Sequence, residues 1–146
     1  VSVIGDLTLG STSTTNLEII SRAGGVPVAG TDFDRVSVSG AVVFGGTLNI
    51  NATGLTGLIA GDSFQLFTAS SYTSGFTSVA MTGAYAPSFT NNLGVWTGSD
   101  LGLGFTFTES TGILSVGAIP EPATYAAIFG GLALAGAVLR SRKRRG

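Results

Sequence analysis

Residues 40–50 read Gly40-Ala41-Val42-Val43-Phe44-Gly45-Gly46-Thr47-Leu48-Asn49-Ile50, and this stretch decides the fold class. It holds two short runs of strand-forming residues on either side of a Gly-Gly pair, and neither run has the periodicity of a helix. Glycine supplies the backbone freedom that a tight corner requires. The pattern predicts two β-strands joined by a corner.

Similar short runs recur from residue 1 to residue 116, separated about every 8–12 residues by Gly, Ser, Thr and Asn. The other clear candidates for strands are residues 6–9, 17–20, 35–38, 63–67, 103–108 and 113–116. Together they predict an all-β body.

One unit of this pattern occurs twice. Gly5-Asp6-Leu7-Thr8-Leu9-Gly10, followed by Asn16-Leu17-Glu18-Ile19, is echoed by residues 40–45 followed by residues 47–50. A repeated strand-corner-strand unit suggests a solenoid in which each coil stacks on the last. A β-sandwich of eight or more short strands would give much the same pattern and remains an alternative.

The composition of the 146 residues excludes much site chemistry. The chain has no Cys and no His, so it holds no disulfide, zinc finger, haem ligand, thiol nucleophile or Ser-His-Asp triad. Charged residues make up only 10% of the chain, which favours a neutral, hydroxyl-rich surface. The length fits one domain and a tail, and we expect no cofactor, no bound metal and no catalytic residue.

The charges are unevenly distributed along the chain. Residues 1–122 carry two basic and eight acidic residues, a net charge of −6. The other five basic residues are Arg140, Arg142, Lys143, Arg144 and Arg145. An acidic body repels phosphates, so nucleic acid is not an expected partner.

The N-terminal residue, Val1, lies in a strand-like run with no initiator Met or apolar leader before it. We therefore expect the chain to be the C-terminal piece of a longer exported precursor whose leader lies upstream.

Residues 1–117 resemble the C-terminal region of autotransporter-associated β-helix repeat proteins. The resemblance is carried by residues 5–9 with 17–19, 29–40, 45–50, 60–67 and 112–116, and it is weakest over residues 68–102. It implies an end of a right-handed parallel β-helix, a solenoid.

The end of the chain has a different composition. A linker, residues 118–122, contains Pro120-Glu121-Pro122, and prolines interrupt regular structure. Residues 123–139 carry no charge and are rich in Ala, Leu, Ile and Gly; residues 140–146 are basic. This order predicts a single hydrophobic transmembrane α-helix over 123–139, with a basic cytoplasmic tail over 140–146.

A 17-residue helix would be roughly 25 Å long, somewhat shorter than the hydrocarbon layer of about 30 Å. Local thinning and snorkelling of Arg140 and Arg142 can make up the difference. The alternative is a buried core helix, although an all-β body offers no evident place for a helix that ends in five cations.

This tail resembles a PEP-CTERM protein-sorting signal, as found on exported proteins of Gram-negative bacteria. The motif is Pro120, Glu121 and Pro122, and the membrane-orienting basic cluster is Arg140, Arg142, Lys143, Arg144 and Arg145. The resemblance implies a transient inner-membrane anchor with the β body outside the cytoplasm, and processing by an exosortase-type enzyme. It also implies later residence at the cell surface or outside the cell, with exopolysaccharide as a possible further partner.

Carboxylates are the only candidates for acid-base or metal chemistry. Asp32 and Asp34 would share one face of a strand and could bind a hard cation, but a solvated corner after Gly30 is the favoured interpretation. Asp6 and Asp62 each follow a glycine and are expected in turns. Asn51-Ala52-Thr53 fits a glycosylation sequon by chance.

Seven aromatic residues are the other candidates for a binding surface. A carbohydrate-stacking platform is one interpretation, but strand spacing puts Phe105 and Phe107 on one side together, as in a core. The seven are Phe64, Phe67, Phe76, Phe89, Trp96, Phe105 and Phe107.

These observations predict an exported, non-enzymatic structural protein of the cell surface or extracellular matrix, held by a C-terminal anchor and processed there. A surface adhesin is one alternative. Another is a polysaccharide-active β-helix enzyme whose active site lies upstream of Val1, which rests on fold analogy alone.

Overall fold

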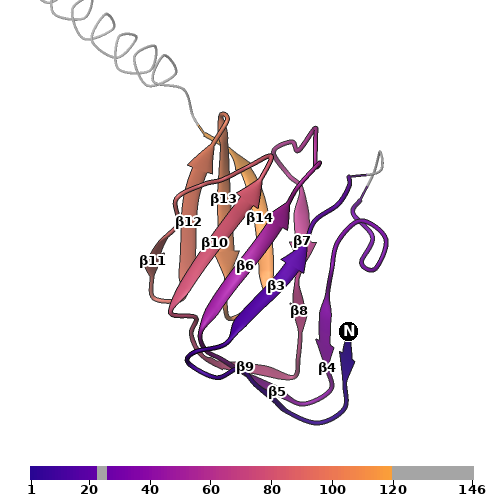
Figure 1. Cartoon of the computed structure of the whole chain (residues 1–146), viewed down its shortest axis with the longest axis vertical. Helices are drawn as coiled ribbons and strands as arrows, with labels where there is room; N and C mark the ends of the chain where they lie inside the picture. The colour runs from indigo at the N-terminus through magenta and orange to yellow at the C-terminus, as the bar shows by residue number, and fades with distance from the viewer. Residues whose placement is uncertain (23–25, 120–146) are drawn as a thin grey trace, which may run out of the picture.

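The computed structural model describes residues 1–22 and 26–119, and within these ranges the chain is all-β. Fourteen strands form four separate sheets, and the described residues contain no helix (Figure 1). The all-β prediction for the body is confirmed.

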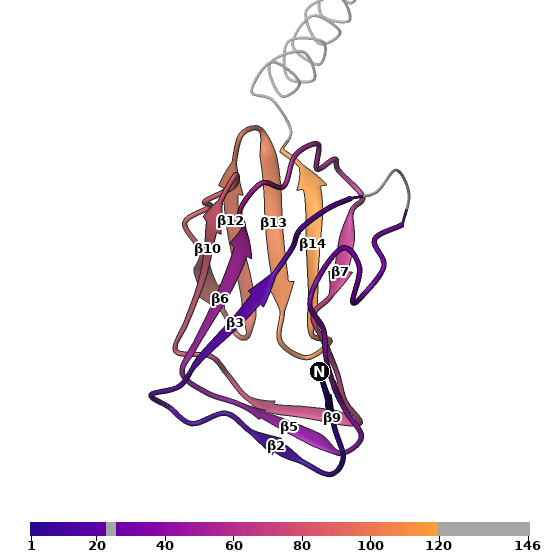
Figure 2. The same cartoon turned by 45° about the vertical axis from the view of Figure 1, so that its right-hand side comes forward.

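Nine strands form three small parallel sheets, each with one strand from each of three successive passes of the chain. The first sheet has the order β1 (Ser2–Val3), β4 (Val36–Val38), β8 (Phe67–Thr68). The second has the order β2 (Leu7–Thr8), β5 (Ala41–Phe44), β9 (Ser71–Ser74). The third has the order β10 (Ser78–Gly83), β6 (Thr47–Ala52), β3 (Thr14–Glu18). Figure 2 shows the β2-β5-β9 sheet crossing below the other strands.

The remaining five strands form one antiparallel sheet. Its order is β11 (Thr90–Asn92), β12 (Val95–Asp100), β13 (Leu103–Thr108), β14 (Ile113–Ala118), β7 (Ser63–Gln65). The chain reverses between β11 and β12 at Leu93-Gly94 and between β12 and β13 at Leu101-Gly102. Both residues of each turn have positive φ, which is the geometry of a tight two-residue hairpin.

These reversals correct the fold prediction. An end of a right-handed parallel β-helix, a solenoid, is wrong, because the strands lie in four separate short sheets and the last of these is antiparallel. Each tight hairpin returns the chain beside the strand it has just left. The predicted hydrophobic α-helix over 123–139 lies outside the described residues. The sandwich alternative does not fit the nine parallel strands either.

The sequence echo corresponds to strands that pair. Leu7 pairs with Val42, the same offset as between Gly5 and Gly40 in the sequence. The second half of the echo is out of register, since Leu17 pairs with Ile50 rather than with Leu48. The echo therefore identifies neighbouring strands, but not the register of both pairs.

The core is one cluster of apolar side chains between the sheets. Burial alternates along β6 and along β13, so each strand turns one face inward. Phe44, Phe67, Phe76 and Phe107 lie together at its centre, with ring centroids between 4.7 and 6.4 Å apart. Phe44, Phe67 and Phe107 come from three different sheets, and Leu48 and Ile50 of β6 in the remaining sheet belong to the same cluster, so packing joins the four sheets into one body.

Candidate functional site

The described chain ends just before the predicted sorting motif. The last strand, β14, ends at Ala118, and one residue, Ile119, separates it from Pro120. Gly117, Ala118 and Ile119 are exposed, although Ala118 still pairs with Leu103. The motif thus follows directly from a strand that is fixed in the sheet and whose end is accessible.

The predicted motif and anchor themselves lie outside the described residues. This holds for Pro120, Glu121 and Pro122, for residues 123–139, and for the basic cluster Arg140, Arg142, Lys143, Arg144 and Arg145. Within residues 1–22 and 26–119, no helix is long and apolar enough to cross a membrane.

Asp32 and Asp34 do not form a shared cation site. Asp32 is buried and accepts hydrogen bonds from the Val28 amide at 2.8 Å and from the Ser21 hydroxyl at 2.5 Å. Asp34 is exposed and accepts from the Glu18 amide at 3.0 Å. No group of three or more His, Cys, Asp or Glu that could hold a metal occurs in the described part of the chain.

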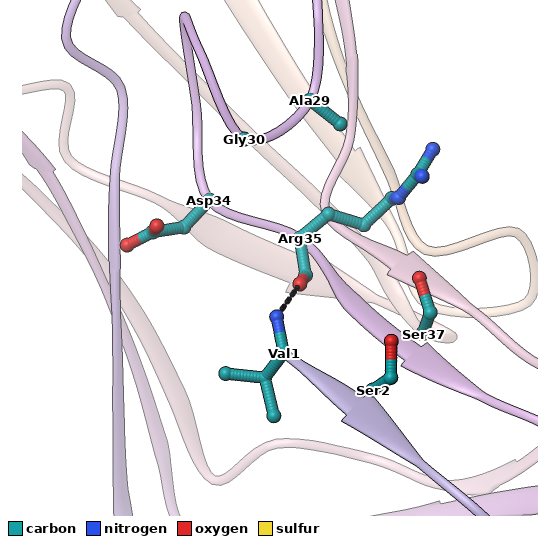
Figure 3. A pocket seen from close by; sticks show the side chains of 7 residues that line it. All are labelled: Val1, Ser2, Ala29, Gly30, Asp34, Arg35 and Ser37. Atoms are coloured by element: carbon teal, nitrogen blue, oxygen red, sulfur yellow. Dashed lines mark hydrogen bonds between the residues drawn. The ribbon is translucent and has the colours of Figure 1, made fainter.

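A hollow of about 170 Å³ lies beside Asp34 and Arg35, where the first strand meets the 29–35 loop (Figure 3). The amino group of Val1 donates to the Arg35 carbonyl oxygen at 2.7 Å. The side chains of Asp34 and Arg35 point in different directions (Figure 3). The charged groups therefore do not converge on one point, as an acid-base or ligand site would require.

Asp6 and Asp62 fasten neighbouring segments of the chain. Asp6 accepts a hydrogen bond from the Ala41 amide at 2.8 Å, so it joins two passes as well as following a turn. Asp62 accepts from the Ile59 amide at 2.8 Å within its turn and forms an ion pair with Arg22 at 2.6 Å. The turn expected at Asp62 is present, and the ion pair connects it to a residue 40 positions away.

A common pattern links the carboxylates of the described body. Six of its seven carboxylates accept a hydrogen bond from a backbone amide; these are Asp6, Asp32, Asp34, Asp62, Asp100 and Glu109. A carboxylate that satisfies a backbone N–H in a loop takes the place of a strand partner. These acidic residues hold corners in position.

The aromatic residues form the core, as favoured from their spacing. Phe64, Phe67, Phe76, Trp96, Phe105 and Phe107 are buried, and Phe89 packs against them. An exposed stacking platform made of these rings is therefore excluded. Asn51 of the sequon accepts from both the amide and the hydroxyl of Thr53, so its side chain holds a local turn.

Glu109 was not singled out by the sequence. It is 6% exposed and follows β13 directly. Its Oε1 accepts hydrogen bonds from the Phe76 amide and from the Trp96 indole Nε1, both at 2.8 Å. A lone acidic residue after an alternating strand gives no sign of this environment, because its partners come from other strands.

Comparison of the chain with protein-family models, curated proteins and solved structures gave no match.

Proposed function

We propose that this protein is an exported, non-enzymatic structural component of the cell surface or extracellular matrix, delivered by a PEP-CTERM signal at its C-terminus. The observation that carries the proposal is the order of three segments at the end of the sequence. Pro120-Glu121-Pro122 is followed by seventeen uncharged residues and then by five basic residues within the last seven. An apolar segment with cations at one end is held in a membrane with the cations on the cytoplasmic side.

The geometry of the body supports this arrangement. β14 ends one residue before Ile119 and residues 117–119 are exposed, so the last described residues before the motif are accessible. Two prolines favour an extended backbone in a short peptide, and because proline has no backbone N–H it cannot continue the hydrogen bonding of the sheet. A processing enzyme of the exosortase type would meet Glu121 in an extended peptide between a folded body and the membrane.

The carboxylates support a structural rather than a catalytic body. Six of them accept backbone hydrogen bonds at corners, which stabilises irregular loops between short strands. A surface adhesin is the second candidate function, and the cavity lined in part by Glu109 is the observation that favours it.

The test is replacement of Pro120, Glu121 and Pro122 together by Ala in the bacterium that makes the protein. We expect the unprocessed chain, which retains residues 123–146, to accumulate in the membrane fraction. Intact mass and C-terminal peptide mapping of envelope and medium would detect it. Wild-type protein should end close to residues 120–122.

Pro27→Ala is the matched control, because Pro27 is a half-buried proline of the body, far in the chain from the motif. It should be processed like the wild type. Processing of the triple variant at the wild-type position and yield would refute the sorting proposal, as would wild-type protein that retains residues 140–145.

A further inference from the structure

A cavity of about 220 Å³ lies where strand β9 approaches the β11–β12 hairpin and the end of β13. The polar residues of its lining are Tyr72, Thr73, Ser74, Glu109 and Ser110. Its apolar lining comes from Leu93, Gly94 and Val95. The cavity thus joins residues from three separate segments, none of which belongs to the proposed sorting motif.

The Glu109 carboxylate is held in one orientation with one oxygen left open. Its Oε1 receives both the Phe76 amide and the Trp96 indole. Its Oε2 accepts no hydrogen bond from any residue that the structure describes. No buried side-chain oxygen or nitrogen of the described residues lacks a hydrogen-bond partner, so Oε2 is reached by solvent and is open to a ligand that donates a hydrogen bond.

Two glycines make room for the Glu109 carboxylate. A Cβ atom at Gly75 would lie 2.8 Å from Oε2, and one at Gly94 would lie 2.9 Å from it. Any other residue at either position would therefore crowd the carboxylate. The absence of a side chain at both positions lets the backbone approach the carboxylate closely.

The lining selects a neutral ligand that donates hydrogen bonds. The lining contains no Lys or Arg, so an anion has no counter-charge there. Glu109 is the sole carboxylate of the lining, and hard cations such as Ca²⁺ take six to eight oxygen ligands with several carboxylates. Hydroxyl groups both donate and accept, which matches the hydroxyls of Thr73, Ser74 and Ser110.

Leu93 adds an apolar contact in an unexpected position. It is 99% exposed and has a φ of 52° in a two-residue hairpin turn, a conformation in which Asn or Gly is preferred. Ser74, on the opposite segment, also has positive φ, at 58°.

We propose that this cavity binds a single neutral sugar ring, with Glu109 Oε2 accepting hydrogen bonds from two of its hydroxyls. Tyr72 and Leu93 would contact the apolar face of the ring. The cavity is smaller than the roughly 300–1,000 Å³ of sites for drug-sized ligands, so it accommodates one ring and leaves the rest of a glycan outside. This function goes beyond delivery of the protein to the surface.

Trp96 provides the measurement. It is the only tryptophan of the chain, and its indole N–H bonds the same carboxylate. The full chain, ¹⁵N-labelled in phosphocholine micelles, would be titrated with methyl glycosides of glucose, galactose, mannose and N-acetylglucosamine up to about 100 mM. We expect a saturable shift of the single indole N–H resonance with at least one sugar, half-complete at millimolar concentration.

Three variants locate the site. Glu109→Gln keeps an acceptor for Trp96 but replaces Oε2 by a donor, and should weaken binding about tenfold or more. Gly75→Ala places a methyl group against Oε2 and should abolish the shift. Leu93→Asn suits the turn and removes the apolar contact, so binding should fall while folding is retained. Leu101→Asn, the same change in the matching turn at the other end of the sheet, is the control.

Four outcomes would overturn the proposal. They are no shift with any of the sugars, an equal shift in Glu109→Gln and Gly75→Ala, an equal loss in Leu101→Asn, and a shift produced by CaCl₂ or ethylammonium but by no sugar. If Glu109→Gln fails to fold, Leu93→Asn and Gly75→Ala still decide the question. Because the titration uses purified protein, its failure would leave the sorting proposal intact.

Discussion

At the scale of the residue, Gly46 shows how closely two passes of the chain approach. It has a φ of 68°, and a Cβ atom there would collide with the carbonyl oxygens of Ser13 and Gly10. The same Ser13 oxygen accepts the Thr47 amide at 2.8 Å, so it cannot move away freely. The corner therefore requires both the backbone conformation and the absent side chain of glycine.

Gly46→Ala should lower the free energy of unfolding by about 2 kcal/mol or more. The left-handed conformation alone costs roughly 1–2 kcal/mol for a residue with a Cβ atom, and the collision adds to it. Urea unfolding followed by circular dichroism would measure the change. Gly117→Ala is the control, since no atom lies within 4 Å of its added Cβ, and it should stay within about 0.5 kcal/mol of wild type. Equal stability of the two variants would contradict this account.

Tyr72 predicts a loss of stability at alkaline pH. Burial raises the pKa of its phenol above the usual 10.0, and a backbone hydrogen bond at Ala69 offsets part of the rise. The folded state therefore holds this proton more tightly than the unfolded state. The stabilisation of the folded state by the protonated Tyr72 phenol is fully present below pH 10.0, and it is lost as the pH rises through the pKa of the folded state.

Unfolding in urea at about pH 9 and about pH 11 would show this loss. Tyr72→Phe cannot ionise at this position, so its free energy of unfolding should decline less between the two pH values. An identical decline in Tyr72→Phe would assign the alkaline effect to other groups.

At the scale of the element, the two hairpins of the antiparallel sheet use leucine where the turn favours asparagine. Leu101 has a φ of 49° and is 73% exposed, and Gly102 follows with a φ of 79°. Leu101→Asn should raise the free energy of unfolding by about 0.5–1 kcal/mol, because Asn tolerates this conformation better. A thermal melt would measure it. A lower midpoint than wild type would mean that the Leu101 side chain makes a stabilising contact.

Strands could be predicted from the sequence where apolar residues were dense. Residues 41–44 and 103–108 were predicted with the bounds that the structure has. The strands Ser71–Ser74, Ser78–Gly83 and Val95–Asp100 were missed. They are rich in Ser, Thr and Gly, and their pairing depends on neighbours supplied by distant segments rather than on their own propensity.

The Glu109 site could not be predicted for the same reason. Trp96 and Glu109 are 13 residues apart and meet because the β12–β13 hairpin pairs Trp96 with Phe107. Phe76 comes from a further segment. No local periodicity encodes such an arrangement, whereas the residues of the proposed sorting motif are contiguous, so that motif can be proposed from the sequence alone.

At the scale of the whole molecule, the separation of charge is the dominant feature. Residues 1–122 carry a net charge of −6, and five cations lie within the last seven residues. In the described body, Arg22 is paired with Asp62, and the Arg35 side chain points away from Asp34 (Figure 3). An acidic body with a basic end has a preferred orientation across a membrane, because cationic flanks stay on the cytoplasmic side.

Under the proposed function, a variant with Gln at all five basic positions should no longer hold the tail on the cytoplasmic side; these positions are Arg140, Arg142, Lys143, Arg144 and Arg145. A potential of about 100 mV contributes roughly 2.3 kcal/mol for each charge moved fully across, so five cations oppose passage strongly and five amides do not. We expect less membrane-held precursor and less cleavage near residue 120, measured by fractionation and protease accessibility of the two ends of the chain. Arg35→Gln, which neutralises a body cation, is the control and should behave as wild type. Unchanged membrane retention and unchanged cleavage in the variant with all five substitutions would show that the apolar segment alone directs sorting.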